Sequence, residues 1–171
     1  MASQNLASSY VLDAGAFYSG IPFLSSSGRY FTTNAVFNEI KHIKSSHAAL
    51  EALLDSGNLQ LAEPSDVEVE LVVTAAKKTG DSAKLSKADI SILALALGLK
   101  KATLVTEDYA VANVATFMRI LVKSISGRGI KETRKWTTFC SACSRTFSPD
   151  VKECPLCGNK LRRKYKKKPI K

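Results

Sequence analysis

The sequence lacks a long hydrophobic run. Its longest apolar stretch, residues 90–99, is interrupted by Ser91 and Gly98, and a membrane-spanning helix needs ~18 to 20 consecutive apolar residues. The first residues also lack the charged start and apolar core of a secretory signal. We therefore expect a cytoplasmic protein that makes no contact with a membrane.

Proline is scarce as well, with five residues among 171, and 45% of all residues are apolar. This composition excludes a disordered or fibrous chain and indicates a globular protein. Single hydrophobic cores are commonest at about 100 to 150 residues. The length therefore fits one domain of roughly 120 residues with a small appendage.

Acidic residues are nearly missing from the C-terminal third. Residues 119–171 hold sixteen Lys or Arg and three Asp or Glu, a net charge of +13. Residues 1–118 hold nine basic and twelve acidic residues, a net charge of −3. Clustered cations gain free energy by releasing the counterions condensed on phosphates, so the C-terminal third is predicted to bind a polyanion.

Cysteine is absent before residue 140, and the four cysteines then form two CxxC pairs separated by ten residues. Each pair can chelate one ion from a tight turn, and two such turns complete the tetrahedral set that zinc accepts. We predict one structural zinc ion, with Gly158 supplying a left-handed backbone after the second pair. Iron in a rubredoxin-like site stays open, because the ligands alone do not distinguish the two metals. Disulfides are disfavoured in a reducing compartment, and the CPxCG form of the second pair disfavours four unliganded thiols. The predicted ligands are Cys140, Cys143, Cys154 and Cys157.

Basic and aromatic residues surround these cysteines. This interleaving suits contact with a nucleic-acid backbone and stacking of bases. The alternative is a solvated basic tail that has no specific partner. The candidate RNA contacts are Trp136, Arg145, Lys152, Lys160, Arg162 and Arg163.

The first 126 residues alternate between short apolar strands and helices. Because strands joined by helices imply right-handed crossovers, we predict an α/β/α sandwich with a mainly parallel sheet. A polar linker, a small zinc ribbon and a basic tail are expected to follow. Strands are expected at 10–12, 30–31, 59–62, 102–106 and 120–122, and helices at 34–43, 48–54, 66–75, 87–97 and 109–117. The predicted divisions are 1–126, 127–136, 137–161 and 162–171.

Four acidic residues of the α/β domain fall at positions that can meet. Asp13 and Asp108 follow predicted strands, Asp89 lies in the first turn of a helix, and Glu39 lies within another helix. Sites in open α/β sheets form beyond the carboxyl ends of the strands. Converging carboxylates repel one another unless a cation neutralises them, and Mg²⁺ or Mn²⁺ prefers oxygen ligands. Taken singly, each acid is also explained as a turn former, a first-turn helix residue or a solvent-facing side chain.

The sequence around these acids resembles the four acidic motifs of PIN-domain ribonucleases. The motifs are residues 11–14, 34–40, 85–96 and 104–109. Together with the four-cysteine ribbon and the basic tail, they resemble over nearly the whole chain the NOB family of endonucleases. That family makes the final cut at the 3′ end of the small-subunit ribosomal RNA precursor. The resemblance implies a PIN-like fold over residues 1–126 and a metal-dependent endoribonuclease.

The resemblance also implies roles for individual residues. Asp13, Asp89 and Asp108 would bind one or two Mg²⁺ or Mn²⁺ ions, with Glu39 as a further ligand or a water-orienting base. Thr106 lies two residues before Asp108 and so faces the same side, where it is expected to hold a metal-bound water or a phosphate oxygen. The implied partners are the ribosomal RNA precursor, the pre-ribosomal particle and other ribosome-assembly factors.

Two other functions stay open. The first is a toxin-type PIN ribonuclease acting on transfer or messenger RNA, against which the ribbon argues. The second is a non-catalytic assembly factor that grips RNA with the ribbon, against which the four intact acids argue.

Overall fold

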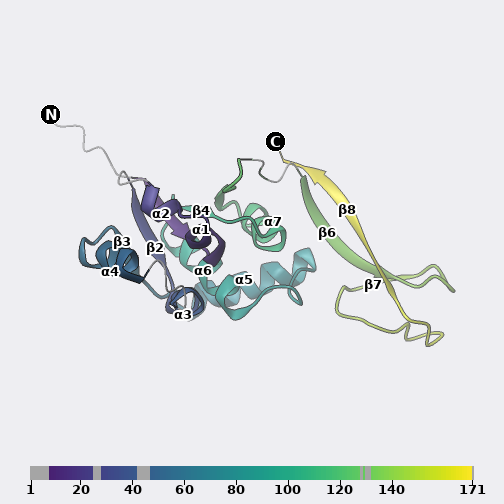
Figure 1. Cartoon of the computed structure of the whole chain (residues 1–171). Helices are drawn as coiled ribbons and strands as arrows, with labels where there is room; N and C mark the ends of the chain where they lie inside the picture. Colours follow the sequence, from purple (N-terminus) through teal and green to yellow (C-terminus); the bar gives the residue numbers. More distant parts are fainter. Residues whose placement is uncertain (1–7, 25–27, 42–46, 128, 130–131, 171) are drawn as a thin grey trace.

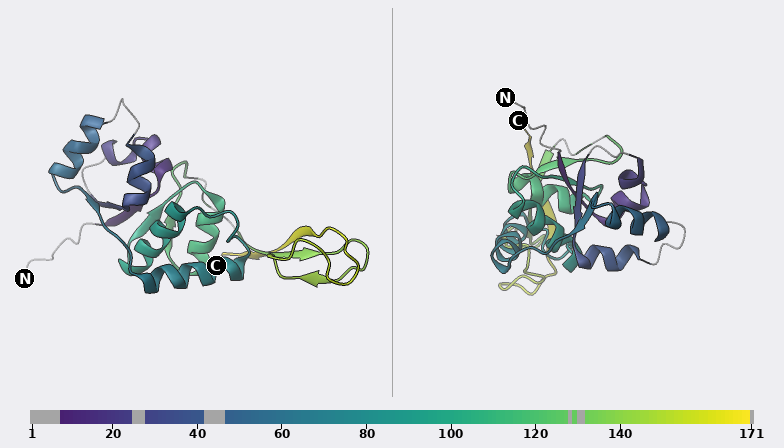
Figure 2. Two further views of the ribbon diagram at one scale, coloured as in Figure 1. Left: turned by 90° about the horizontal axis from the view of Figure 1, so that it is seen from below. Right: turned by 90° about the vertical axis from the view of Figure 1, so that its left-hand side faces the viewer.

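The computed structural model describes residues 8–24, 28–41, 47–127, 129 and 132–170. A five-stranded sheet with helices forms the first part of the chain, and a three-stranded antiparallel module formed by residues 132–169 extends away from it (Figures 1 and 2). We refer to these parts as the α/β domain and the C-terminal module.

All five strands of the larger sheet are parallel, in the order β3-β2-β1-β4-β5. The chain runs outward from β1 in one direction through β2 and β3, and then returns to place β4 on the other side of β1. The carboxyl ends of β1 and β4 therefore lie side by side where the strand order reverses, the usual position of a site in such sheets. The strands are β1 (Ser9–Leu12), β2 (Arg29–Thr32), β3 (Leu59–Leu61), β4 (Thr103–Val105) and β5 (Leu121–Lys123).

Helices cover both faces of this sheet, and the predicted α/β/α sandwich is confirmed. The right-hand view of Figure 2 shows α1 to α4 on one side of the strands and α5 to α7 on the other. The first group is α1 (Ala14–Tyr18), α2 (Ile21–Leu24), α3 (Asn34–Ile40) and α4 (His47–Asp55). The second group is α5 (Asp66–Thr79), α6 (Lys87–Gly98) and α7 (Tyr109–Phe117).

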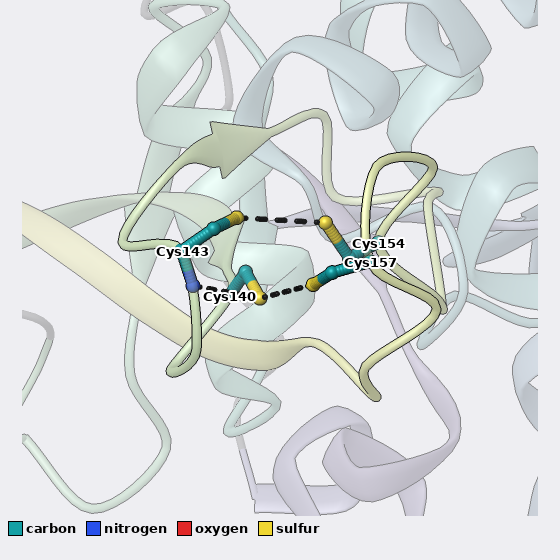
Figure 3. A group of neighbouring side chains, drawn as sticks. All are labelled: Cys140, Cys143, Cys154 and Cys157. Atoms are coloured by element: carbon teal, nitrogen blue, oxygen red, sulfur yellow. Dashed lines mark hydrogen bonds between the residues drawn. The ribbon is translucent and has the colours of Figure 1, made fainter.

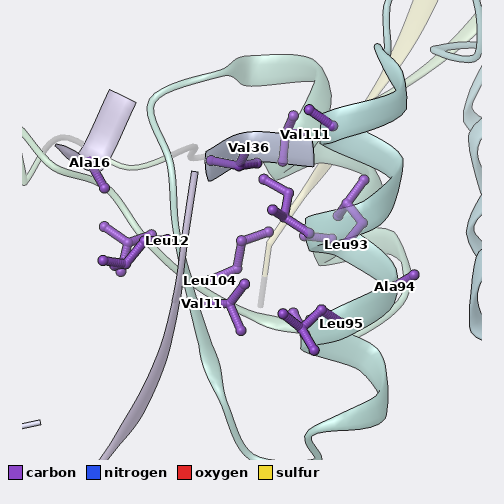
Figure 4. Packing of buried hydrophobic residues seen from close by; sticks show 14 of the residues in the cluster. Val11, Leu12, Ala16, Val36, Leu93, Ala94, Leu95, Leu104 and Val111 are labelled. Atoms are coloured by element: carbon purple, nitrogen blue, oxygen red, sulfur yellow. The ribbon is translucent and has the colours of Figure 1, made fainter. Parts of the chain in front are cut away.

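Branched aliphatic side chains of the central strands form the core. Val11 on β1 and Leu104 on β4 are completely buried and lie near Leu93 of α6 and Val111 of α7 (Figure 4). Both strands are covered on both faces, which explains why they read as continuous apolar runs rather than as alternating ones. The core thus fixes the two strands that carry Asp13 and Asp108.

Local signals at the helix ends act as the sequence predicts. Capping boxes formed by Ser65 with Glu68 and by Ser86 with Asp89 begin α5 and α6. The start of the chain differs, because α1 begins directly after Asp13, where the sequence predicts a turn. The helix predicted over 34–43 ends at Ile40, and residues 42 and 43 lie outside the described residues.

The C-terminal module is a strand pair rather than a linker and a tail. Its strands are β6 (Glu132–Phe139), β7 (Thr146–Phe147) and β8 (Arg162–Pro169), and β6 pairs with both others. Residues 132–136, predicted as linker, are therefore part of β6, and residues 162–169, predicted as basic tail, form β8. The two strands pair over eight residues each. Trp136 and Tyr165 are direct partners with ring centroids 4.8 Å apart, and such a pair stabilises strands that charge alone would keep apart.

A buried asparagine joins this module to the α/β domain. Asn113 of α7 donates through Nδ2 to the Asp81 carboxylate (2.6 Å) and to the Arg134 carbonyl (2.8 Å), and its Oδ1 accepts from the Arg134 N–H (2.8 Å). Both Asn113 and Asp81 are buried. The backbone of β6 is therefore tied to α7, and the same asparagine ties α7 to the loop after α5.

A second docking contact surrounds Gly80, which ends α5 with a positive φ of 80°. A Cβ atom at this position would lie 2.7 Å from Cβ of Trp136 and 2.8 Å from Pro149. Arg163 donates to the Gly80 carbonyl (2.7 Å), and its guanidinium lies 4.5 Å from the Trp136 ring centroid. The absence of a side chain on Gly80 is what permits this close approach.

Within the described residues, no helix is long and apolar enough to cross a membrane.

Candidate active site and metal centre

Asp13 lies where β1 ends and α1 begins. Its backbone N–H donates to the Val105 carbonyl of β4 (3.3 Å), and its Oδ1 accepts from the Ala16 N–H (2.9 Å) as the N-cap of α1. The side chain is 8% exposed. Gly15 permits this tight turn, because a Cβ there would lie 3.2 Å from Asp13 Oδ1.

Burial is the main influence on the ionisation of Asp13. Desolvation raises the pKa of Asp13, while hydrogen bonds from Thr106 and from the Ala16 N–H partly offset this rise. The nearby carboxylates of Asp89 and Asp108 raise the pKa further. A charged Asp13 therefore lies among other negative groups in a poorly solvated place, where a cation would be favourable.

Asp108 lies beyond the neighbouring strand β4 and caps α7. Its Oδ1 accepts from the N–H groups of Ala110 (2.6 Å) and Val111 (3.0 Å). The buried Thr106 accepts from the Asp108 N–H (3.0 Å) and also hydrogen-bonds Asp13. Thr106 thus connects the backbone of Asp108 with the Asp13 side chain at the end of β4.

The other two predicted acids come from helices on opposite faces of the sheet. Asp89 is in the first turn of α6, where Oδ2 accepts from the Ser86 N–H (2.8 Å). Glu39 lies on the exposed side of α3. The two helices meet beyond the end of β2, where the hydroxyl groups of Thr33 and Ser91 are hydrogen-bonded (2.7 Å). The two carboxylates therefore approach the strand ends from two directions.

All four predicted acids line one cavity of about 320 Å³ at the carboxyl ends of β1 and β4: Asp13, Glu39, Asp89 and Asp108. The structure therefore brings together residues that lie far apart in the sequence. Glu107 also lines this cavity, although the sequence analysis did not single it out. Its carboxylate accepts hydrogen bonds from the Ser126 N–H and the Ser124 hydroxyl, which lower the pKa of Glu107. Its position directly before Asp108 is the signal that could have identified it.

Carboxylate oxygens are the ligands that Mg²⁺ and Mn²⁺ prefer, so the residues of this cavity fit such an ion. Their oxygens do not form a closed cage. Among the described residues, the four cysteines are the one group of three or more acids, histidines or cysteines whose ligand atoms converge closely enough to hold an ion. Mg²⁺ commonly keeps several waters and uses only one or two carboxylates. An open arrangement of carboxylates is therefore suited to a hydrated divalent ion.

The four cysteines converge between two turns of the C-terminal module (Figure 3). Sγ of Cys140 lies 3.5 Å from Sγ of Cys157, and Sγ of Cys143 lies 3.6 Å from Sγ of Cys154. Sulfur atoms around a tetrahedral zinc ion lie about 3.8 Å apart, given Zn–S bonds of about 2.3 Å. The predicted four-cysteine cluster is thus present with spacing that suits one tetrahedral metal ion.

Backbone geometry at both turns orients these thiols. Gly158 follows the second pair with a φ of 66°, as predicted, and Ser144 follows the first pair with a φ of 58°. The Cys143 N–H donates to the Cys140 sulfur and is the main reason that the pKa of Cys140 is lowered to about 6. The Asn159 N–H favours the Cys157 thiolate, but the neighbouring Cys140 and Cys154 outweigh it and raise the pKa of Cys157 to about 12. One cation at the centre would remove this mutual repulsion and allow all four thiols to ionise.

The predicted RNA contacts divide into two groups. Trp136 and Arg163 belong to the docking contact around Gly80, with Lys84 also 5.1 Å from the Trp136 ring centroid. Their side chains thus already connect the two parts of the chain, although Arg163 is exposed, and their contact with RNA stays a prediction. The other four are exposed on the C-terminal module: Arg145, Lys152, Lys160 and Arg162.

Comparison with known proteins agrees with this geometry. Residues 10–99 match the family described as PIN domain of ribonuclease. The chain is 36% identical to Endoribonuclease Nob1 of Methanocaldococcus jannaschii over 94% of this chain and 80% of that protein. It is 32% identical to Ribonuclease VapC1 of Thermoplasma acidophilum over 93% of this chain and 79% of that protein. A shorter match, 41% identical, covers 42% of this chain and 15% of the 20S-pre-rRNA D-site endonuclease NOB1 of Saccharomyces cerevisiae.

Proposed function

Because this chain belongs to the Nob1 family of PIN-domain endoribonucleases, we propose that it cleaves the small-subunit ribosomal RNA precursor at its mature 3′ end within a pre-ribosomal particle. The observation that carries this proposal is the single cavity lined by Asp13, Glu39, Asp89 and Asp108. A relative named for the D-site of 20S pre-rRNA supports the choice of substrate. Other ribosome-assembly factors are the protein partners that this role implies.

The carboxylates of this cavity hold one or two Mg²⁺ or Mn²⁺ ions in the proposed mechanism. When bound, such an ion lowers the pKa of a water for attack and neutralises charge that develops on the phosphoryl group. Asp13, Asp89 and Asp108 are the proposed ligands. Glu39 is exposed at the rim of the cavity, where its carboxylate serves as a further ligand or orients the attacking water.

Thr106 has a positioning role in this proposal. Its hydroxyl hydrogen-bonds Asp13 and accepts from the Asp108 N–H (3.0 Å). It thereby holds the Asp13 side chain and the backbone of Asp108 at the ends of adjacent strands before a metal arrives. Preorganised ligands reduce the reorganisation that the reaction requires.

Charge is divided between the two parts of the chain in a way that suits an RNA hydrolase. The acidic cavity repels RNA on its own, and the basic C-terminal third supplies attraction. We propose that the α/β domain cuts and that the C-terminal module binds, with one zinc ion held by its four cysteines. Thiols that share a metal are typical of a reducing compartment, and this supports a cytoplasmic location.

The substrate assignment is tested with three labelled RNAs. The protein is incubated in Mn²⁺ with a precursor fragment that spans the mature 3′ end of small-subunit ribosomal RNA, with a transfer RNA and with a messenger RNA of equal length. We expect one dominant cut at the mature 3′ end of the precursor fragment. Preferred cutting of the transfer or messenger RNA would favour the toxin-type function instead. Failure to cut any RNA, with intact zinc content and RNA binding, would favour a non-catalytic assembly factor.

A further inference from the structure

A second cavity, of about 420 Å³, lies between the α/β domain and the C-terminal module. Its walls are the carboxyl ends of α5 and α7 and the facing strands β6 and β8, which run side by side past α7 in Figure 1. Six of its ten lining residues are cations, and none is acidic. We call this cavity the basic seam. Its cations are Lys78, Arg134, Lys135, Lys166, Lys167 and Lys168.

The charges of the basic seam are only partly neutralised. Glu132 pairs with Arg134 (3.2 Å) and with Lys167 (3.1 Å), which are direct partners across β6 and β8. Lys135 and Lys166 are likewise direct partners, but neither forms an ion pair within the part of the chain that the structure describes. Like charges that face each other directly destabilise a strand pair. An external anion at Lys135 and Lys166 would relieve a repulsion that Glu132 relieves one position away.

An aromatic side chain lies at the edge of this cavity. Phe117 ends α7 and is 51% exposed. It lines both the basic seam and an adjoining cavity of about 270 Å³, and Lys168 also lines both. Arg119 contributes a further cation to the adjoining cavity. An exposed ring among cations combines the two features that bind single-stranded nucleic acid, which are a face for stacking and charges for phosphates.

We propose that the basic seam binds the backbone of single-stranded RNA, with one base stacked on Phe117. This proposal rests on the proposed function, since it places a second segment of the same substrate. An acidic protein segment would satisfy the lysines, but it would leave the exposed ring of Phe117 without a flat partner. RNA uses both features.

Helix α7 sets the distance between this site and the acidic cavity. Asp108 caps its first turn, and Phe117 is its last residue. At a rise of 1.5 Å per residue the two are about 14 Å apart along the helix axis. A stacked strand advances about 3.4 Å per nucleotide, so the basic seam holds RNA about four nucleotides from the cut.

The cationic part of the proposal is tested by RNA binding without cleavage. Full-length, zinc-loaded protein is titrated into a fluorescein-labelled 12-mer of oligouridine in EDTA, and anisotropy is measured at several salt concentrations. The test variant is Lys78→Ala with Lys168→Ala. The control is Lys77→Ala with Lys164→Ala, which removes the same charge from α5 and β8 but outside the basic seam.

We expect the test variant to lower the slope of log affinity against log salt by about 1.4, because each phosphate contact to a single strand contributes about 0.7. The control is expected to change this slope much less. Equal slopes for test and control would overturn the basic seam as the binding site. The measurement needs neither a metal ion in the acidic cavity nor cleavage, so it stands even if the protein cuts no ribosomal RNA.

Stacking is tested separately at Phe117. Phe117→Ala is expected to weaken binding about 5-fold to 100-fold, as for other stacking residues, whereas Phe117→Trp keeps it. Leu121→Ala is a matched control, because Leu121 is also exposed (59%) but lines neither cavity. Wild-type affinity in Phe117→Ala would overturn the stacking assignment. Unlabelled polyglutamate and unlabelled oligouridine are also compared as competitors of the labelled 12-mer. Equal competition by the two, with polyglutamate competition unchanged in Phe117→Ala, would show an acidic protein partner instead.

Discussion

The buried Asn113 joins the C-terminal module to the α/β domain, so Asn113→Ala is expected to be strongly destabilising. The substitution removes hydrogen bonds to Asp81 (2.6 Å), to the Arg134 carbonyl (2.8 Å) and from the Arg134 N–H (2.8 Å). Each neutral bond contributes about 1 kcal/mol and the bond to a carboxylate about 1.5 to 3 kcal/mol. Asp81 is 1% exposed, Asn113 donates to its Oδ2, and its Oδ1 has no hydrogen-bond partner among the described residues. Because the substitution would leave both oxygens unpaired, we expect a total loss of about 3 to 5 kcal/mol.

The assay is equilibrium unfolding in urea, followed by circular dichroism and by fluorescence of Trp136, the single tryptophan. Trp136 lies in the docking contact, so its emission reports on attachment of the module. Thr116→Ala is the matched control on the same helix, since it removes one bond within α7, to Ala112, and is expected to cost about 1 kcal/mol. A loss below about 1 kcal/mol in Asn113→Ala would refute the reasoning.

The same argument predicts the behaviour of a double variant. Removing the carboxylate together with its partner, in Asp81→Ala with Asn113→Ala, leaves no unpaired buried charge. The double variant is therefore expected to lose less free energy of unfolding than the sum of the losses of the two single variants, by a coupling energy of about 1 to 3 kcal/mol. Strict additivity would show that the Asp81–Asn113 contact carries no energy of its own.

Three further predictions concern the metal centre, the docking contact and the acidic cavity. Cys140→Ser is expected to lose zinc on dialysis against a chelator, as measured by elemental analysis, while the wild type keeps one ion per chain; equal zinc content would contradict the four-cysteine site. Gly80→Ala places a Cβ atom 2.7 Å from Trp136, so we expect a shifted Trp136 emission and weaker RNA binding, and an unchanged spectrum would count against this contact. Burial raises the pKa of Asp13 above its value in the unfolded chain. The folded protein therefore binds this proton more tightly, and the resulting stabilisation is full below ~pH 4 and is lost as the pH rises through the raised pKa. In EDTA at neutral pH, Asp13→Asn should therefore unfold at higher urea than the wild type, by about 1 kcal/mol, and a less stable variant would contradict the account.

Much of the α/β domain is predictable from sequence because its signals are local. The apolar runs that become β1 and β4 are buried on both faces, and the capping boxes at Ser65 and Ser86 begin helices where they are expected. Chelating pairs of cysteines with fixed spacing are local signals too. These features survive in the structure because nothing distant competes with them.

The C-terminal module shows why other features were missed. Residues 162–169 are dense in Lys and Arg, and charge density indicates a solvated tail. Their pairing with β6 depends on a partner about thirty residues away and on the contact of Trp136 with Tyr165. The approach of Trp136 to Gly80 likewise depends on tertiary structure, so the sequence alone does not show this contact.

The sequence predicts each of the four acids of the acidic cavity, but it does not show that their side chains converge. Asp13 and Asp108 meet because β1 and β4 are neighbours, and Asp89 and Glu39 join them because α6 and α3 pack together. The sequence does not identify Glu107 as a site residue, because Asp108 beside it is the residue that matches the motif. The structure adds the position of each group relative to the others.

Cleavage by the acidic cavity is tested by replacing Asp13 alone. Asparagine retains the oxygen that caps α1 at the Ala16 N–H (2.9 Å) but not the charge. A precursor fragment that spans the mature 3′ end of small-subunit ribosomal RNA is incubated in Mn²⁺ with wild type or Asp13→Asn at equal zinc content and equal RNA affinity. We expect the wild type to cut the fragment and Asp13→Asn to leave it intact; equal cutting by both proteins would contradict the account.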